Sequence, residues 1–112
     1  MQITNVASQP IKKNPHNVDA KKLYDKEHGQ AMHIELKPGE SLRKHITPVD
    51  VFFYVLEGKA TIEIGEETEE VDKENLVESP AKIPHRVMNN SDNTVRFLVV
   101  KMPKPTDSTK LL

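Results

Sequence analysis

The chain has 112 residues, a formal net charge of −1 at pH 7 and no cysteine. This length predicts one domain with a single small core. The near-neutral charge provides no basic field for nucleic acid or an anionic membrane, and the lack of cysteine excludes disulfides, thiolate metal ligands and cysteine nucleophiles. No apolar run approaches the roughly 18 residues that span a bilayer, and no secretion leader is visible, so we expect a cytoplasmic protein.

Short apolar runs rich in Val, Ile, Phe and Thr follow one another along the chain, with turn residues between them. We expect strands at residues 18–24, 30–36, 51–56, 59–64, 69–71, 76–79, 85–89 and 95–102. Strands at this spacing indicate an all-β sandwich or barrel with little helix. Within this single domain, residues 1–29 form an arm and the first strand, residues 30–102 the barrel, and residues 103–112 a tail.

The run from Val51 to Leu56 is apolar on both faces of the expected strand. Alternate residues point to opposite sides, with Val51, Phe53 and Val55 on one side and Phe52, Tyr54 and Leu56 on the other. A surface strand of a small barrel needs only one apolar face. A strand between the barrel interior and a second protomer needs two, so this run predicts a homodimer.

Two histidines forty residues apart, His45 and His85, lie in segments with regular spacing. In the first segment Gly39, His45 and Gly58 are separated by five and twelve residues, and in the second Pro80, His85 and Asn89 are separated by four and three. These segments resemble the two motifs of the cupin superfamily, G-x5-H-x-H-x3-4-E-x6-G and G-x5-P-x-G-x2-H-x3-N.

The frame of both motifs is present here, while several ligand and turn positions differ. Thr47 stands in the slot of the second histidine and Val51 in that of the carboxylate. Glu74 and Lys82 replace the two glycines of the second motif, and the lysine suggests that its loop does not need a positive φ.

The resemblance implies an all-β fold, the double-stranded β-helix or cupin barrel, which is a jelly-roll variant. It also implies that His45 and His85 approach each other at the barrel mouth. Our first hypothesis is a small barrel protein that binds a small polar or anionic molecule there, with metal weak or absent. His45, Thr47, His85 and Asn89 are its candidate ligand-binding residues.

The alternative hypothesis is a dioxygenase or isomerase that uses a divalent metal, Fe, Mn, Ni or Zn. His45 and His85 would bind the ion together with Asp50 or water, because two neutral imidazoles hold a dication poorly without an anion. Asp50 would face inward only if a bulge near Pro48 shifted the strand register by one residue. An inward Asp50 therefore favours the enzyme, and an inward Val51 favours the binding protein.

Three further features have competing interpretations. His33 either faces the cavity or lies outside it, and the alternation of Met32, Ile34 and Leu36 favours the outside. Lys82 could reach over the mouth toward an anion or could be an ordinary surface lysine. The acidic run at residues 66–74 reads most simply as a solvated hairpin, and His16 and His28, beside turn residues, are expected to face solvent.

Overall fold

The computed structural model describes all 112 residues, as ten β-strands and one short 3-10 helix. The elements are η1 (Val6–Ser8), β1 (Asp19–Lys26), β2 (Gly29–Leu36), β3 (His45–Ile46), β4 (Asp50–Glu57), β5 (Lys59–Ile64), β6 (Glu67–Asp72), β7 (Leu76–Ser79), β8 (His85–Met88), β9 (Val95–Met102) and β10 (Lys110–Leu111). Little helix was expected, and the only helix has three residues.

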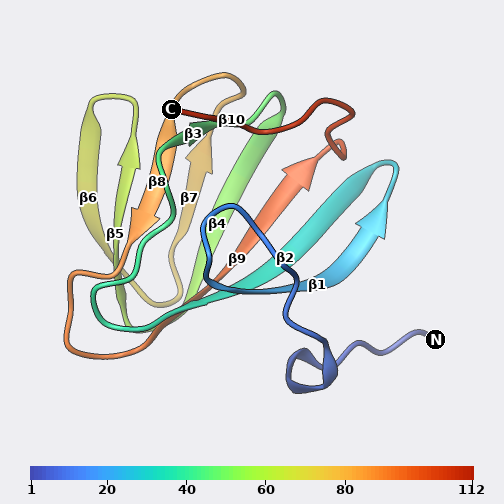
Figure 1. The fold of residues 1–112 in the computed structure, drawn as a ribbon, viewed down its shortest axis with the longest axis horizontal. Coiled ribbons are helices and arrows are strands. Elements are labelled where there is room, and N and C mark those ends of the chain that lie inside the picture. The colour runs from blue at the N-terminus through green and yellow to red at the C-terminus, as the bar shows by residue number, and fades with distance from the viewer.

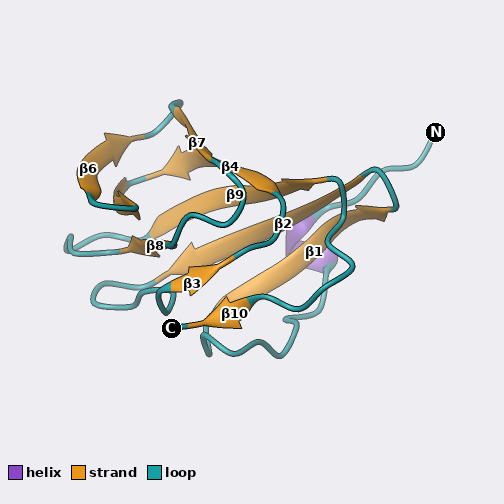
Figure 2. Ribbon diagram, turned by 90° about the horizontal axis from the view of Figure 1, so that it is seen from above, coloured by secondary structure: helices purple, strands orange, loops and turns teal.

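The strands form two five-stranded sheets that face each other (Figures 1 and 2). One sheet has the order β1-β2-β9-β4-β7, and the other has the order β10-β3-β8-β5-β6. All pairings between neighbouring strands are antiparallel. Figure 2 shows β3 and β10 in a layer below β4, β9 and β2. The expected all-β jelly-roll barrel is therefore confirmed.

The core lies between the sheets and is built from alternate residues of the strands. On β4 the inward residues Val51, Phe53 and Val55 are buried, while the outward residues between them are half-buried. On β9 the inward set begins with Val95, Phe97 and Val99, and it packs beside the β4 set because the two strands are neighbours. Fourteen buried apolar residues form one cluster, as a single small domain requires.

All eight expected strands are present, with boundaries that shift by a few residues. The two strands that the sequence did not reveal, β3 and β10, have two residues each, too few for an alternating pattern. β10 comes from residues 103–112, and its Leu111 is the register partner of His45 on β3. The N-terminal arm, blue in Figure 1, folds back beside β1, where the Lys12 amide donates to the Ala20 carbonyl.

The two motif positions where glycine is replaced retain the glycine backbone conformation. Glu74 has φ 71° and Lys82 has φ 68°, so the expectation that the lysine loop needs no positive φ was wrong. Backbone hydrogen bonds hold these turns, from the Glu74 amide to the Val55 carbonyl and from the Lys82 amide to the Thr47 carbonyl. The turn geometry is therefore imposed by the barrel even though side chains disfavour it.

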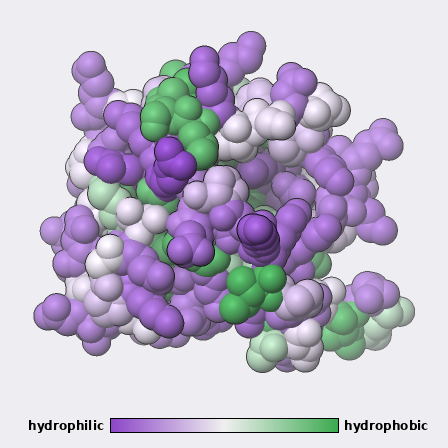
Figure 3. All heavy atoms as spheres, viewed as in Figure 1, coloured by the Kyte–Doolittle hydropathy of each residue, from purple (hydrophilic) through white to green (hydrophobic).

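The single helix is not long and apolar enough to cross a membrane. The face shown in Figure 3 is largely hydrophilic, with hydrophobic side chains in separate patches. The acidic run lies mostly on β6, where five of the six residues are exposed, as expected of a solvated hairpin.

Candidate functional site

A cavity of about 390 Å³ lies between the two sheets, at the end of the barrel that the N-terminal arm and the C-terminal tail border. Strands β1, β2, β4 and β9 supply its apolar wall, including Met32, Ile34 and Phe53, and β3 and β8 supply its histidines. Residues 12–16 of the N-terminal arm and residues 108–109 of the tail complete the rim. Cavities of this size hold small molecules.

His45 and His85 meet inside this cavity as register partners on β3 and β8. Their Nε2 atoms are 3.0 Å apart. His45 Nδ1 lies 2.6 Å from the Arg43 carbonyl oxygen, which can only accept, so this nitrogen carries the proton and Nε2 of the neutral ring is an acceptor. His85 Nε2 consequently donates to His45, and its Nδ1 accepts from the Ser79 hydroxyl at 2.6 Å.

Both rings are held neutral by their surroundings. The pKa of His85 is lowered to about 3, mainly by burial and to a smaller extent by the nearby His45, Lys101 and His16. Burial also lowers the pKa of His45, although its hydrogen bond to the Arg43 carbonyl opposes the shift. Because charging either ring in this site is costly, the pair acts near pH 7 as hydrogen-bonding groups.

A third histidine, His16, joins the pair from the N-terminal arm. Its ring centroid is 4.8 Å from that of His45, and its Nδ1 accepts from the Arg43 amide at 2.8 Å. Burial, followed by the charge of His45, lowers its pKa to about 4. The expectation that His16 faces solvent was wrong, because only the folding of the arm over the barrel brings it there.

Lys101 on β9 also lines the cavity. It continues the inward set of Val95, Phe97 and Val99, so the period of two could have placed it inside. Burial lowers the pKa of its ammonium group, and the charge of Lys12 lowers it further. No ion pair in the structure involves Lys101, and no aspartate or glutamate lines the cavity.

Of the four residues predicted to bind ligand, three line the cavity and one does not. The hydroxyl oxygen of Thr47 lies 3.2 Å from His85 Nε2, so Thr47 stands beside the two histidines. Asn89 is fully buried outside the cavity, and its amide donates to the Leu36 and Asn93 carbonyls and accepts from Ser91. Asn89 thus lies apart from the other three predicted residues, and its hydrogen bonds hold a loop together.

Asp50 does not join the histidines. Its side chain is exposed and accepts from the Ala81 amide at 2.8 Å, while Val51 is only 4% exposed and faces the core. The bulge that would have turned Asp50 inward is absent at this point, because β4 pairs in regular register with β9 from Asp50 to Val55 and with β7 from Val51 to Tyr54.

His33 and Lys82 also lie outside the cavity. His33 is buried on the outer side of its sheet, where its Nε2 accepts from the Arg96 guanidinium at 3.1 Å. The alternation of β2 thus places His33 outside, as favoured. Lys82 is exposed in its turn, so the interpretation that places it over the mouth was wrong.

The donors present do not fit a resident catalytic metal. No group of three or more histidine, cysteine, aspartate or glutamate side chains is placed to hold an ion. His45 and His85 are neutral imidazoles, Nδ1 of His16 is engaged by the Arg43 amide, and the charged residues of the lining are lysines. A dication there would lack the anionic or third protein ligand that such sites use.

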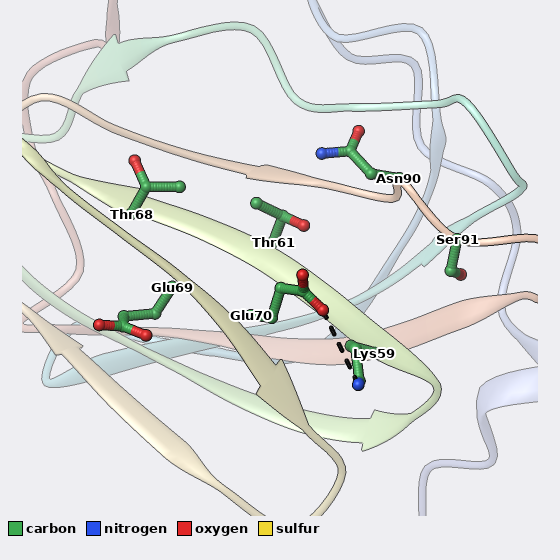
Figure 4. Close-up of a pocket in the computed structure, with 7 residues that line it drawn as sticks. All are labelled: Lys59, Thr61, Thr68, Glu69, Glu70, Asn90 and Ser91. Carbon is green, nitrogen blue, oxygen red and sulfur yellow. Dashed lines mark ion pairs between the residues drawn. The ribbon is translucent and has the colours of Figure 1, made fainter.

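A second concavity, of about 510 Å³, lies on the outer surface of β5 and β6 and has no hydrophobic lining (Figure 4). Figure 4 shows Lys59 and Glu70 side by side in it, and their charged groups are 3.7 Å apart. Because both side chains are exposed, this pair is worth little. The cavity with the histidines is therefore the candidate functional site.

Two facing antiparallel sheets with paired histidines at one end define a small double-stranded β-helix protein. Residues 32–101 match the cupin domain family, and the chain belongs to this family. An uncharacterized protein of Methanocaldococcus jannaschii is 32% identical over 85 residues, which cover 75% of this chain and 73% of that protein. Its crystal structure, described as an RmlC-like cupin, has a TM-score of 0.73, with 92% of this chain and 94% of that chain covered at 26% identity.

Two other crystal structures are similar over most of the chain. TT1209 of Thermus thermophilus is 27% identical with a TM-score of 0.81, covering 94% of this chain and 100% of that chain. The polyketide cyclase RemF of Streptomyces resistomycificus has a TM-score of 0.85 and 23% identity, covering 100% of this chain and 85% of that chain. At that identity the likeness to RemF shows the fold alone.

Proposed function

We propose that this protein binds a small anionic organic molecule in the cavity between its sheets, without a resident metal. The observation that carries the proposal is the charge of the lining. Lys12, Lys13 and Lys101 line the cavity together with three histidines, and no carboxylate does. Cations confined around a partly apolar cavity attract an anion, since a low-dielectric wall strengthens their field.

The histidine pair would fix the orientation of the bound ligand. His45 and His85 present hydrogen-bonding nitrogens in fixed orientations, because the Arg43 carbonyl and the Ser79 hydroxyl hold the opposite nitrogens. An anionic oxygen of the ligand that replaces the hydrogen bond between the rings could accept from His85 Nε2, and a hydroxyl of the ligand could donate to His45 Nε2. Thr47 adds a hydroxyl that both donates and accepts beside His85.

Anion binding is tested by NMR titration of the full chain with sodium benzoate, sodium citrate and sodium phosphate at constant ionic strength. The expected result is a saturable shift of backbone amides around the cavity for at least one anion, with the neutral compound benzamide as the matched control. If none of the three anions moves these amides, the proposed function is wrong.

The second candidate is a dioxygenase or isomerase that uses Fe, Mn, Ni or Zn. One observation favours it: the two Nε2 atoms lie close enough together to bind one ion. The donor set argues against it, since Asp50 points away and only two imidazoles remain. Mass spectrometry of tag-free protein, purified without chelator, should find far less than one metal ion per chain, both in the wild type and in His45→Ala. Near-stoichiometric metal that the substitution removes would contradict a metal-free site and establish the metal centre that the second candidate requires.

A further inference from the structure

The cavity wall divides into an apolar part and a cationic part. Met32, Ile34 and Val99 form an apolar surface on neighbouring strands β2 and β9. Lys101 lies two residues beyond Val99 on the same inward side of β9. A ligand that fills this cavity therefore meets apolar side chains and one partly buried ammonium group on the same strand.

Lys101 differs from the other two lysines of the lining. Lys12 and Lys13 are exposed on the arm, where water solvates them, while Lys101 is partly buried and has no acidic partner. A partly buried charge without an acidic partner loses part of its solvation, which is a cost to the fold, and no ion pair in the structure offsets that cost. A ligand anion beside Lys101 would offset it.

We propose that Lys101 determines specificity by pairing with the carboxylate of an amphipathic monocarboxylate, whose apolar body lies on Met32, Ile34 and Val99. This inference rests on the proposed function and narrows it to one ligand class. One partly buried cation matches one negative charge, whereas a polyanion would leave further charges against the apolar wall without partners. The cavity volume of about 390 Å³ is near the lower end for ligand sites, so the apolar body is small.

The test compares benzoate with benzamide, which has nearly the same shape and no charge. In NMR titrations of wild-type protein, benzoate should bind at least about tenfold more tightly, because a hydrogen bond to a charged group outweighs a neutral one. Citrate and phosphate should bind more weakly than benzoate. Lys101→Met should remove the preference for benzoate over benzamide, and Lys101→Arg should keep most of it.

Lys73→Met is the matched control, because it removes an exposed lysine that does not line the cavity. It should leave the ratio of benzoate to benzamide affinity within about threefold of the wild type, as expected for a solvated charge. Lys101→Met should also be at least as stable as the wild type in thermal unfolding, since it replaces an unpaired, partly buried charge with an apolar chain.

The outcomes separate the two proposals. If citrate or phosphate binds and benzoate does not, the ligand class is wrong and anion binding stands. If Lys101→Met keeps the preference for benzoate, or is less stable than the wild type, the role of Lys101 is wrong and anion binding again stands. If no anion binds the wild type, both proposals fail.

Discussion

His45 and His85 are direct register partners on β3 and β8, and their Nε2 atoms lie 3.0 Å apart inside the barrel. Each ring is fixed from behind, His45 by the Arg43 carbonyl and His85 by the Ser79 hydroxyl. The Arg43 carbonyl, the two rings and the Ser79 hydroxyl therefore form one continuous chain of hydrogen bonds, in which each donor and each acceptor is assigned.

Ser79→Ala should break this chain at its buried end. Ser79 is 1% exposed and is the partner of His85 Nδ1, so the variant leaves a buried acceptor unpaired. Unfolding in urea should show a loss of about 1–3 kcal/mol. Ser41→Ala, at a serine without a side-chain hydrogen bond, should change stability by less than about 0.5 kcal/mol. Equal stability of the two variants would show that Ser79 does not hold the ring.

The neutral histidines predict a loss of stability in mild acid. His85 has a folded-state pKa of about 3 against an ordinary value of 6.5, so between these values the unfolded chain binds more protons and stability falls as pH falls. At about 1.4 kcal/mol per pKa unit, His85 alone predicts a loss of roughly 2 kcal/mol from pH 7 to pH 5. Urea unfolding at both pH values measures it. A free energy of unfolding that does not change would contradict the neutral pair.

Asn89→Ala should destabilise the protein without changing ligand affinity. The amide of Asn89 is fully buried and bonds to Leu36, Ser91 and Asn93, so its loss leaves several buried groups unpaired at a cost of about 2 kcal/mol or more. Thermal unfolding and benzoate titration measure the two effects. Asn90→Ala, at the exposed neighbouring position, is the control. A loss of benzoate affinity without a loss of stability would show that Asn89 belongs to the ligand site.

Lys82→Gly should stabilise the protein, because Lys82 has φ 68°. A left-handed conformation costs a side-chain-bearing residue about 1–2 kcal/mol, and the greater freedom of glycine in the unfolded chain offsets part of this gain. We expect a net gain of about 0.5–1 kcal/mol in urea unfolding. Lys82→Ala retains the Cβ and should gain nothing, so an equal gain in both variants would point to the lysine charge instead.

We propose that the outer face of β4 is a homodimer interface. Phe52, Tyr54 and Leu56 are half-buried there, and Tyr54 lies between Leu98 of β9 and Leu76 of β7, which is 51% exposed. A contiguous apolar surface of this kind marks a protein–protein interaction site. Light scattering at micromolar concentration should give twice the chain mass of 12.7 kDa.

Tyr54→Asp should give the mass of one chain, because a charge cannot be buried in that interface. Thr61→Asp, on the other sheet, should leave the dimer intact. A wild-type mass of 12.7 kDa would contradict the homodimer.

The sequence alone determined the fold and half of the site. Short apolar runs and the turn residues between them are local properties of the chain, so they located all eight longer strands, but they left open whether Val51 or Asp50 faces inward. The resemblance of the two motifs to those of cupins likewise implied that His45, Thr47 and His85 lie in one site.

Only the tertiary structure decided what surrounds these residues. His16 reaches His45 because the arm folds over the barrel, Ser79 reaches His85 from β7, and β10 pairs with β3 from the far end of the chain. No local pattern encodes such contacts, since their partners are distant in sequence and too short to show a period. The isolation of Lys101 from every carboxylate is likewise a property of the whole cavity, which no single strand reveals.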